Sequence, residues 1–165
     1  MPDQKEIVIN TSPLLALIAA WGMLDPLKSL YRKIWVPYEV GAEIEQGGSR
    51  GFGVSEFRSA GFLARLESPL TISPFLENSL DRGEAAVIQA AIDRNIRTVC
   101  IDEIVGRRIA RLNGLELTGS LGILARAYRE GHEFSMEEVI ARMQDRGVRL
   151  SERVIRFALA QARIE

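Results

Sequence analysis

Thiol and imidazole groups are nearly absent from this sequence of 165 residues, which contains one cysteine and one histidine. A single cysteine excludes an internal disulfide, and Cys100 lies in an apolar run where a buried, inert thiol is expected. His132 lies in a predicted turn and is interpreted as neither a base nor a ligand. Because no Cys/His spacing typical of zinc occurs, only oxygen ligands remain for a metal ion.

Long apolar runs and an excess of one charge are also lacking. No apolar run approaches the roughly 20 residues that a transmembrane helix needs. The polar residues 1–6 lack the apolar core of a signal peptide, so a cytoplasmic protein without membrane contact is expected. Lys and Arg number 21 against 22 Asp and Glu, and the net charge of −1 provides no overall attraction to nucleic acid, although it permits a local basic patch.

The residues that are present predict a single domain over residues 1–165. Short apolar runs predict buried strands at residues 7–9, 34–36, 70–72, 97–101 and 115–117. Amphipathic segments predict helices at residues 13–21, 23–31, 38–46, 55–66, 81–94, 104–113 and 119–129, with Ser12 as the N-cap of the first. The glycine-rich stretch 47–53 is interpreted as a mobile loop within the domain.

This alternation predicts an α/β fold, a three-layer α/β/α sandwich with a parallel sheet of four or five strands. The α/β core spans about residues 6–130, and residues 131–165 form a C-terminal helical extension. In that extension Ser135 and Ser151 are predicted to cap two helices separated by Gly147, which gives a helical hairpin. The apolar stripe of the hairpin is interpreted as core packing.

Polar residues gather at the predicted carboxyl ends of the strands, which right-handed crossovers place at one edge of the sheet. They are Asn10, Thr11, Ser12, Asp102, Glu103, Thr118 and Ser120, with Glu43 and Glu84 on neighbouring helices. Oxygen ligands of this kind suit Mg²⁺ or Mn²⁺. A carboxylate-held Mg²⁺ can activate water and stabilise charge in phosphodiester cleavage.

The acidic residues also have purely structural interpretations. Asp81 and Glu84 form a capping box, in which the Glu84 carboxylate would bond only the Asp81 amide. Asp102 and Thr118 could each be the N-cap of the helix that follows. Glu43 lies on a short helix with two other glutamates and could simply be solvated. Joint placement at the ends of parallel strands favours a site.

Two arginines follow Asp102 on one helix face. Arg107 and Arg111 are four residues apart, so both could contact a phosphate backbone near the metal. A solvated face paired with Glu103 explains the same pattern equally well.

Five motifs, in this order, resemble those of PIN domains. They are Asn-Thr-Ser-Pro-Leu at 10–14, Val-Pro at 36–37 followed by Glu43, Arg-Gly-Glu-Ala-Ala at 82–86, Ile-Asp-Glu at 101–103 and Thr-Gly-Ser-Leu-Gly at 118–122. The match covers about residues 6–130, and the tail also fits a prokaryotic PIN-like subfamily of largely uncharacterised members. The resemblance implies a metal-dependent ribonuclease fold, used in many prokaryotes as the toxin of VapBC-type toxin–antitoxin pairs. Its implied partners are RNA, a small antitoxin and a second copy of the chain.

The resemblance also implies the roles of individual residues. Glu43, Glu84 and Asp102 would form the acidic metal site, with Glu103 as an additional acid. Thr11 or Ser12, together with Ser120, would hydrogen-bond water or phosphate. The first metal-binding Asp of the family is Asn10 here, which offers a neutral oxygen and removes one negative charge.

Three functional hypotheses follow. The leading one is a Mg²⁺- or Mn²⁺-dependent endoribonuclease, a toxin-like hydrolase in which a metal-activated water attacks the phosphodiester. The second, favoured by Asn10, is a PIN-like module that binds RNA or an antitoxin without catalysis. The third is a phosphatase or nucleotide-binding domain, which the missing glycine-rich phosphate loop weakens.

Overall fold

A five-stranded parallel sheet lies at the centre of the computed structural model, which describes residues 5–163. The strand order is β3-β2-β1-β4-β5. The strands are β1 (Glu6–Ile9), β2 (Lys33–Val36), β3 (Ala64–Arg65), β4 (Thr98–Cys100) and β5 (Glu116–Thr118). The predicted α/β/α sandwich with a parallel sheet is confirmed, and within the described residues the strands number five.

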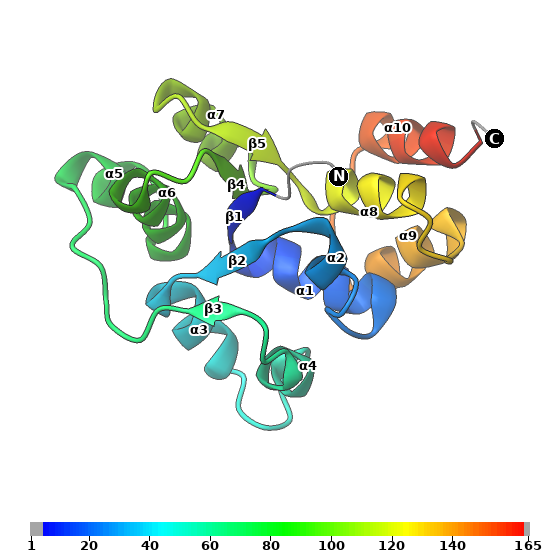
Figure 1. Ribbon diagram of the computed structural model, residues 1–165, viewed down its shortest axis with the longest axis horizontal. Coiled ribbons are helices and arrows are strands. Elements are labelled where there is room, and N and C mark those ends of the chain that lie inside the picture. Colours follow the sequence, from blue (N-terminus) through cyan, green and yellow to red (C-terminus); the bar gives the residue numbers. More distant parts are fainter. Residues whose placement is uncertain (1–4, 164–165) are drawn as a thin grey trace.

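Helices cover both faces of this sheet. Figure 1 shows α5, α6 and α7 on one side of the sheet and α1, α8, α9 and α10 on the other. The helices are α1 (Thr11–Trp21), α2 (Leu27–Leu30), α3 (Tyr38–Glu45), α4 (Val54–Ser59), α5 (Pro74–Ser79), α6 (Arg82–Arg94), α7 (Ile104–Leu112), α8 (Ser120–Arg129), α9 (Met136–Asp145) and α10 (Glu152–Arg163). No helix in the described part of the chain is long and apolar enough to cross a membrane.

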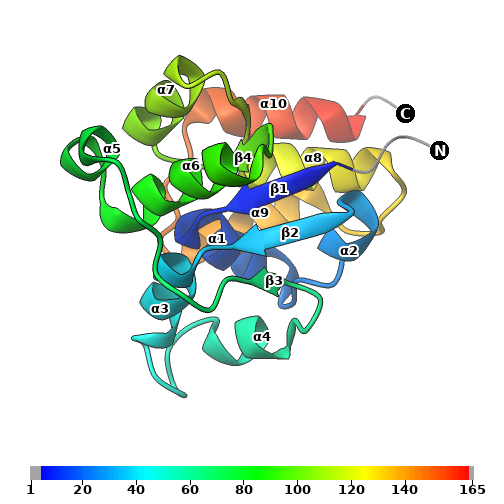
Figure 2. The same ribbon diagram turned by 60° about the vertical axis from the view of Figure 1, so that its left-hand side comes forward.

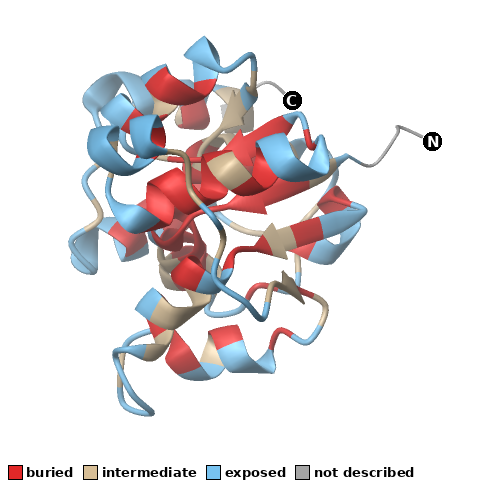
Figure 3. Ribbon diagram, turned by 90° about the vertical axis from the view of Figure 1, so that its left-hand side faces the viewer, coloured by how far each residue is buried: buried red, intermediate tan, exposed pale blue. Residues whose placement is uncertain are grey.

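The core follows from the apolar runs that predict the strands. Ile7, Val8 and Ile9 are completely buried, as a parallel strand covered on both faces requires. Figure 3 shows buried residues concentrated in the sheet and on the helix sides that face it. Cys100 in β4 is also fully buried, and burial raises the pKa of its thiol well above the usual value. The prediction of an inert thiol agrees with this environment.

The predicted strand at residues 70–72 is wrong. The edge strand is instead β3, which pairs with the end of β2. The Leu70 amide donates 2.8 Å to a carboxylate oxygen of Glu39, a buried residue of α3, rather than to a neighbouring strand. The predicted helix at 55–66 is correspondingly too long, because α4 ends at Ser59 and the chain then turns into β3.

The start of the first helix also differs from the prediction. α1 begins at Thr11, and the N-cap residue is Asn10 rather than Ser12. The Asn10 side chain makes no capping hydrogen bond, so its amide group is directed elsewhere. At the other end of the chain, Ser135 and Ser151 accept the amides of Glu138 and Val154, which confirms both predicted caps of the hairpin.

Candidate functional site

The strand order places a crevice beside Asn10 and Asp102. β1 lies between β2 and β4, so the chain progresses outward from β1 in both directions. In parallel sheets, ligands bind outside the carboxyl ends of the strands at such a switch point. Asn10 follows β1 and donates its backbone amide 3.1 Å to the Cys100 carbonyl, which joins the two strand ends. In Figure 2 the arrows of β1 and β2 point toward the side on which α3 and α5 lie.

Glu43 reaches this edge from α3. Its Oε2 atom accepts a 2.9 Å hydrogen bond from the hydroxyl of Thr11, a buried residue in the first turn of α1. A Cβ atom added to Gly83 would lie 2.9 Å from Glu43 Oε2 and 3.3 Å from Asn10 Oδ1. The Glu43 carboxylate and the Asn10 amide oxygen are therefore neighbours over the first turn of α6, as the sequence predicts.

Asp102 lies on the other side of the crevice, after β4. Its Oδ1 atom accepts a 2.8 Å hydrogen bond from the amide of Ser120, at the start of α8. It therefore does not cap α7, whose N-cap residue is Glu103. The Asp102 carboxylate thus lies at the positive end of the α8 dipole. Ser120 contributes this amide, and its side chain is almost completely buried.

Glu84 lies in the first turn of α6. Its side chain is buried, and its Oε2 atom packs against Gly106 of α7. Burial is the largest cause that raises the pKa of the Glu84 carboxyl to about 8. The Asp81 carboxyl, and then the negative charges of Glu103 and Glu43, raise this pKa in the same direction. Burial and neighbouring negative charges therefore both disfavour the ionised form of the Glu84 carboxyl.

Three glycines also belong to this site, although they are not among the predicted site residues. A Cβ at Gly83 would crowd Glu43, one at Gly106 would clash with Glu84, and one at Gly119 would lie 2.8 Å from Asp102 Oδ1. Gly83 and Gly106 lie within helices, where glycine costs about 1 kcal/mol relative to alanine. This unfavourable placement is the signal in the sequence that could have identified them.

The remaining predicted residues are only partly brought together. Ser12 and Glu103 both line a cavity that reaches Asp102. The Arg107 guanidinium instead donates to the carbonyls of Ile101 and Thr118, at 2.7 and 3.2 Å, and so ties α7 to the strand ends. Arg111 is exposed on the same helix and lines none of the cavities near Asp102. Neither arginine forms an ion pair with Glu103 in the described structure.

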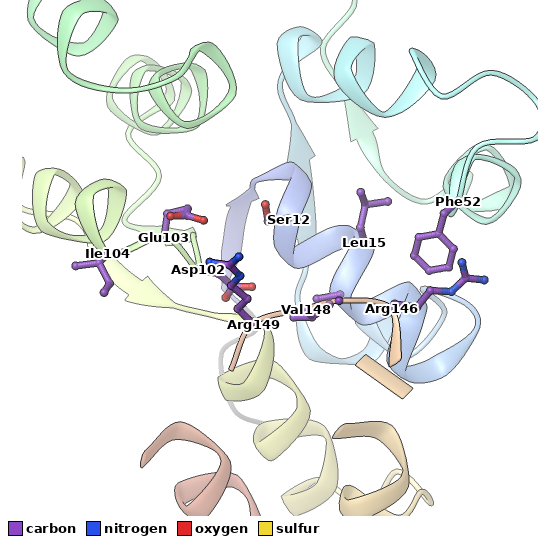
Figure 4. Close-up of a pocket in the computed structure, with 11 residues that line it drawn as sticks. Ser12, Leu15, Phe52, Asp102, Glu103, Ile104, Arg146, Val148 and Arg149 are labelled. Atoms are coloured by element: carbon purple, nitrogen blue, oxygen red, sulfur yellow. The ribbon is translucent and has the colours of Figure 1, made fainter. Parts of the chain in front are cut away.

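Two solvent-filled cavities meet at Asp102. The first, of about 600 Å³, lies between α1 and the loop joining α9 to α10 and is shown in Figure 4. The second, of about 500 Å³, lies between the start of α8 and α10. Asp102, Ile104 and Arg149 line both cavities. The two cavities, which share this part of their lining, are together called the Asp102 groove below.

The donor set has the chemistry that a hard divalent cation prefers. Glu43, Glu84 and Asp102 supply carboxylate oxygens, and Asn10 supplies an amide oxygen. Burial and the neighbouring Asp81, Glu103 and Glu43 carboxyls raise the pKa of Glu84, and a bound cation would act in the opposite direction. Among residues 5–163, however, no three acidic, histidine or cysteine side chains lie close enough together to surround one ion.

Comparison with known proteins identifies the fold family. A search of curated proteins found none that matches the chain. A family model described as a PIN domain matches residues 6–163, which is nearly the whole sequence. This match includes the C-terminal hairpin as well as the α/β core. On the grounds of this match, the strand order and the acidic edge of the sheet, the chain belongs to the PIN-domain family.

Proposed function

We propose that this PIN domain is a Mg²⁺- or Mn²⁺-dependent endoribonuclease. The observations that support the proposal are the neighbouring Asn10 and Glu43 oxygens over Gly83, the charges of Glu103 and Glu43 acting on Glu84, and the position of Asp102 after β4, the strand beside β1. These groups come from separate elements, and repulsion from the Glu103 and Glu43 carboxylates contributes to the raised pKa of Glu84. Independent helix caps would not need to converge in this way.

The side chains would divide the work as follows. Glu43, Glu84 and Asp102 would hold the ion, with Asn10 as a neutral ligand and Glu103 as a further acid at the entrance. The bound ion would supply activation of water and stabilisation of phosphodiester charge. The Thr11 hydroxyl holds the Glu43 carboxylate, and the Ser120 amide holds Asp102. No three carboxylates converge among the described residues. Binding of an ion would therefore require these side chains to move closer to one another.

The wider setting belongs to the same proposal. PIN domains of this kind resemble the toxins of toxin–antitoxin pairs, so a small antitoxin and a second copy of the chain are the partners we propose. Cleavage of cellular RNA would place the protein in the cytoplasm.

The decisive experiment is cleavage of a mixed pool of structured and unstructured RNA by the purified protein. It is run with Mg²⁺, with Mn²⁺ and with EDTA, beside Asp102→Asn as a control for contaminating nuclease. Cleavage that requires metal and disappears in the variant supports the proposal. Equal cleavage by Asp102→Asn would refute the assigned site, because this variant replaces a ligand carboxylate by an amide and preserves side-chain size.

A second candidate function is a binding module for RNA or an antitoxin that does not cleave. Asn10 favours it, because this residue removes one charge from the metal site, and so does the incomplete convergence of the carboxylates. Under this alternative, folded wild-type protein binds RNA but cleaves nothing with either metal, and Asn10→Asp introduces cleavage.

A further inference from the structure

The Asp102 groove has a strongly acidic side, which a polyanionic substrate must nevertheless approach. Asp102 and Glu103 line its first cavity, and the negative charge of Glu103 also acts on Glu84. Among the residues that line this cavity, the basic ones are Arg146 and Arg149. Both come from the loop between α9 and α10, in the C-terminal hairpin. In this first cavity the basic side chains are therefore supplied by the hairpin rather than by the α/β core.

This loop is held in place by packed elements. α9 buries Val139, Ile140 and Met143 and packs along α1. α9 ends at Asp145, and Gly147 shortly after it has a φ of +81°. The chain turns back there, so that the Val148 amide donates 3.0 Å to the Met143 carbonyl. The loop that follows is thereby directed into the groove rather than into solvent, as Figure 4 shows for Arg146, Val148 and Arg149.

The two arginines occupy different parts of the groove. Arg149 lines both cavities and lies beside Asp102 in Figure 4. Its exposed guanidinium forms no hydrogen bond or ion pair with any residue in the described part of the chain. Arg146 lies at the far end, with its guanidinium carbon 4.1 Å from the ring centre of Phe52, which the glycine-rich loop supplies.

Arg107 provides an informative contrast. Its guanidinium also lies beside Asp102, close to where a Gly119 Cβ would be, but it is engaged with two strand-end carbonyls. The Arg107 guanidinium therefore stabilises the fold, whereas the Arg149 guanidinium has no partner in the described chain. An unpaired, exposed guanidinium at the edge of a groove is suited to bind a phosphate.

We propose that residues 146–149 bind the phosphodiester backbone of the RNA strand, with Arg149 at the phosphate next to the acidic site and Arg146 at one further along. The inference rests on the proposed nuclease function and assigns to the C-terminal hairpin the substrate-binding side of the groove. The RNA would lie between α1 and this loop, across Asp102.

The test measures binding of a fluorescent single-stranded RNA oligonucleotide in EDTA over a series of salt concentrations. Each lost phosphate contact reduces the slope of log affinity against log salt by about 0.7 for a single strand. Arg149→Ala and Arg146→Ala should each weaken binding and flatten this slope by about that amount. Arg153→Ala is the matched control, because Arg153 is exposed, lies four residues from Arg149 and lines neither cavity.

Two further measurements separate this inference from the proposed function. Arg149→Ala should bind Mn²⁺ and melt like the wild type, because the side chain holds no ligand in place, and Arg149→Lys should restore the salt slope. If the wild type cleaves RNA in a metal-dependent manner while Arg149→Ala and Arg146→Ala bind like Arg153→Ala, the inference is wrong and the nuclease stands. If the wild type neither binds nor cleaves RNA, both fail.

Discussion

Glu43, Glu84 and Asp102 each have a carboxylate oxygen close to a glycine. The partners are Gly83, Gly106 and Gly119, each from a different segment. A carboxylate that packs against a glycine can approach the backbone more closely than one that meets a Cβ atom. The three glycines thus make room for negative groups that would otherwise be held further from the crevice.

Substitution of Gly83 separates this role from stability. Gly83→Ala should raise the free energy of unfolding by as much as about 1 kcal/mol, because alanine is the better helix former. It should weaken Mn²⁺ binding and RNA cleavage, because the new Cβ would displace the Glu43 carboxylate, 2.9 Å away. Urea unfolding and Mn²⁺ titration measure the two effects.

Gly61→Ala is the control, since a Cβ at Gly61 would meet open space. Equal metal affinity in the Gly83→Ala and Gly61→Ala variants would contradict the role of Gly83.

The raised pKa of Glu84 predicts how the free energy of unfolding depends on pH in the absence of divalent metal. Its pKa is about 8 in the folded protein, against an ordinary value of 4.5. Between these values the folded state retains a proton that the unfolded state has lost, so stability decreases as pH rises through this range. Urea unfolding in EDTA should show this decrease, and Glu84→Gln should reduce it. A wild-type stability that increases from pH 5 to 8 in EDTA, with no difference in slope in the variant, would contradict the raised pKa.

Asn10 has a physical explanation in the same charge balance. The residue is buried, and its amide oxygen lies near Glu43 over Gly83. An aspartate here would add another negative charge to a site that already raises the pKa of Glu84. Asparagine keeps an oxygen donor at this position and avoids that repulsion.

At the scale of elements, α9 connects the hairpin to the α/β core. Its buried apolar residues face α1, and the Arg142 side chain donates 2.9 Å to the Ala20 carbonyl near the end of α1. The helix that begins after β1 therefore also supports the element that carries Arg146 and Arg149. This arrangement confirms that the apolar stripe of α9 belongs to the core.

Truncation of a buried methionine tests how strongly α9 is held. Met143→Ala should lower the free energy of unfolding by about 2–5 kcal/mol, because Met143 is completely buried and its loss leaves a cavity. Chemical denaturation measures the change. Met23→Ala is the matched control, since the Met23 side chain is half exposed, and a similar small loss in both variants would show that α9 packs loosely.

At the scale of the whole molecule, residues 131–165 are expected to be part of the single folded unit. α9 buries four apolar side chains, and α10 packs on α8 with Ala158 fully buried. A chain that ends at Glu130 would expose the α1 surface that α9 covers, so it should lose cooperative thermal unfolding. A chain that ends at Leu150 lacks only α10 and should retain cooperative unfolding at a lower temperature. Cooperative unfolding of the shorter chain would identify the α/β core as independent.

The sequence predicted elements best where local signals and burial agree. β1 is a run of three buried β-branched residues, and α6 begins at Arg82 after the N-cap Asp81, whose carboxylate accepts the Glu84 amide at 2.9 Å. Residues 70–72 show an equally good strand pattern, yet they form no ladder because Glu39 binds the Leu70 amide. That competition involves a residue 31 positions away, so no local pattern could reveal it.

The sequence alone determined the parallel α/β sandwich and the acidic residues at the strand ends, because these properties depend on local periodicity and on the chirality of crossovers. It also excluded an internal disulfide, because the chain has a single cysteine. Tertiary structure alone decided the approach of three glycines to three carboxylates, the engagement of Arg107 with strand-end carbonyls and the placement of Arg149 beside Asp102. Those features join residues far apart in the chain. Their geometry depends on how packed helices are oriented, which the pattern of single residues does not specify.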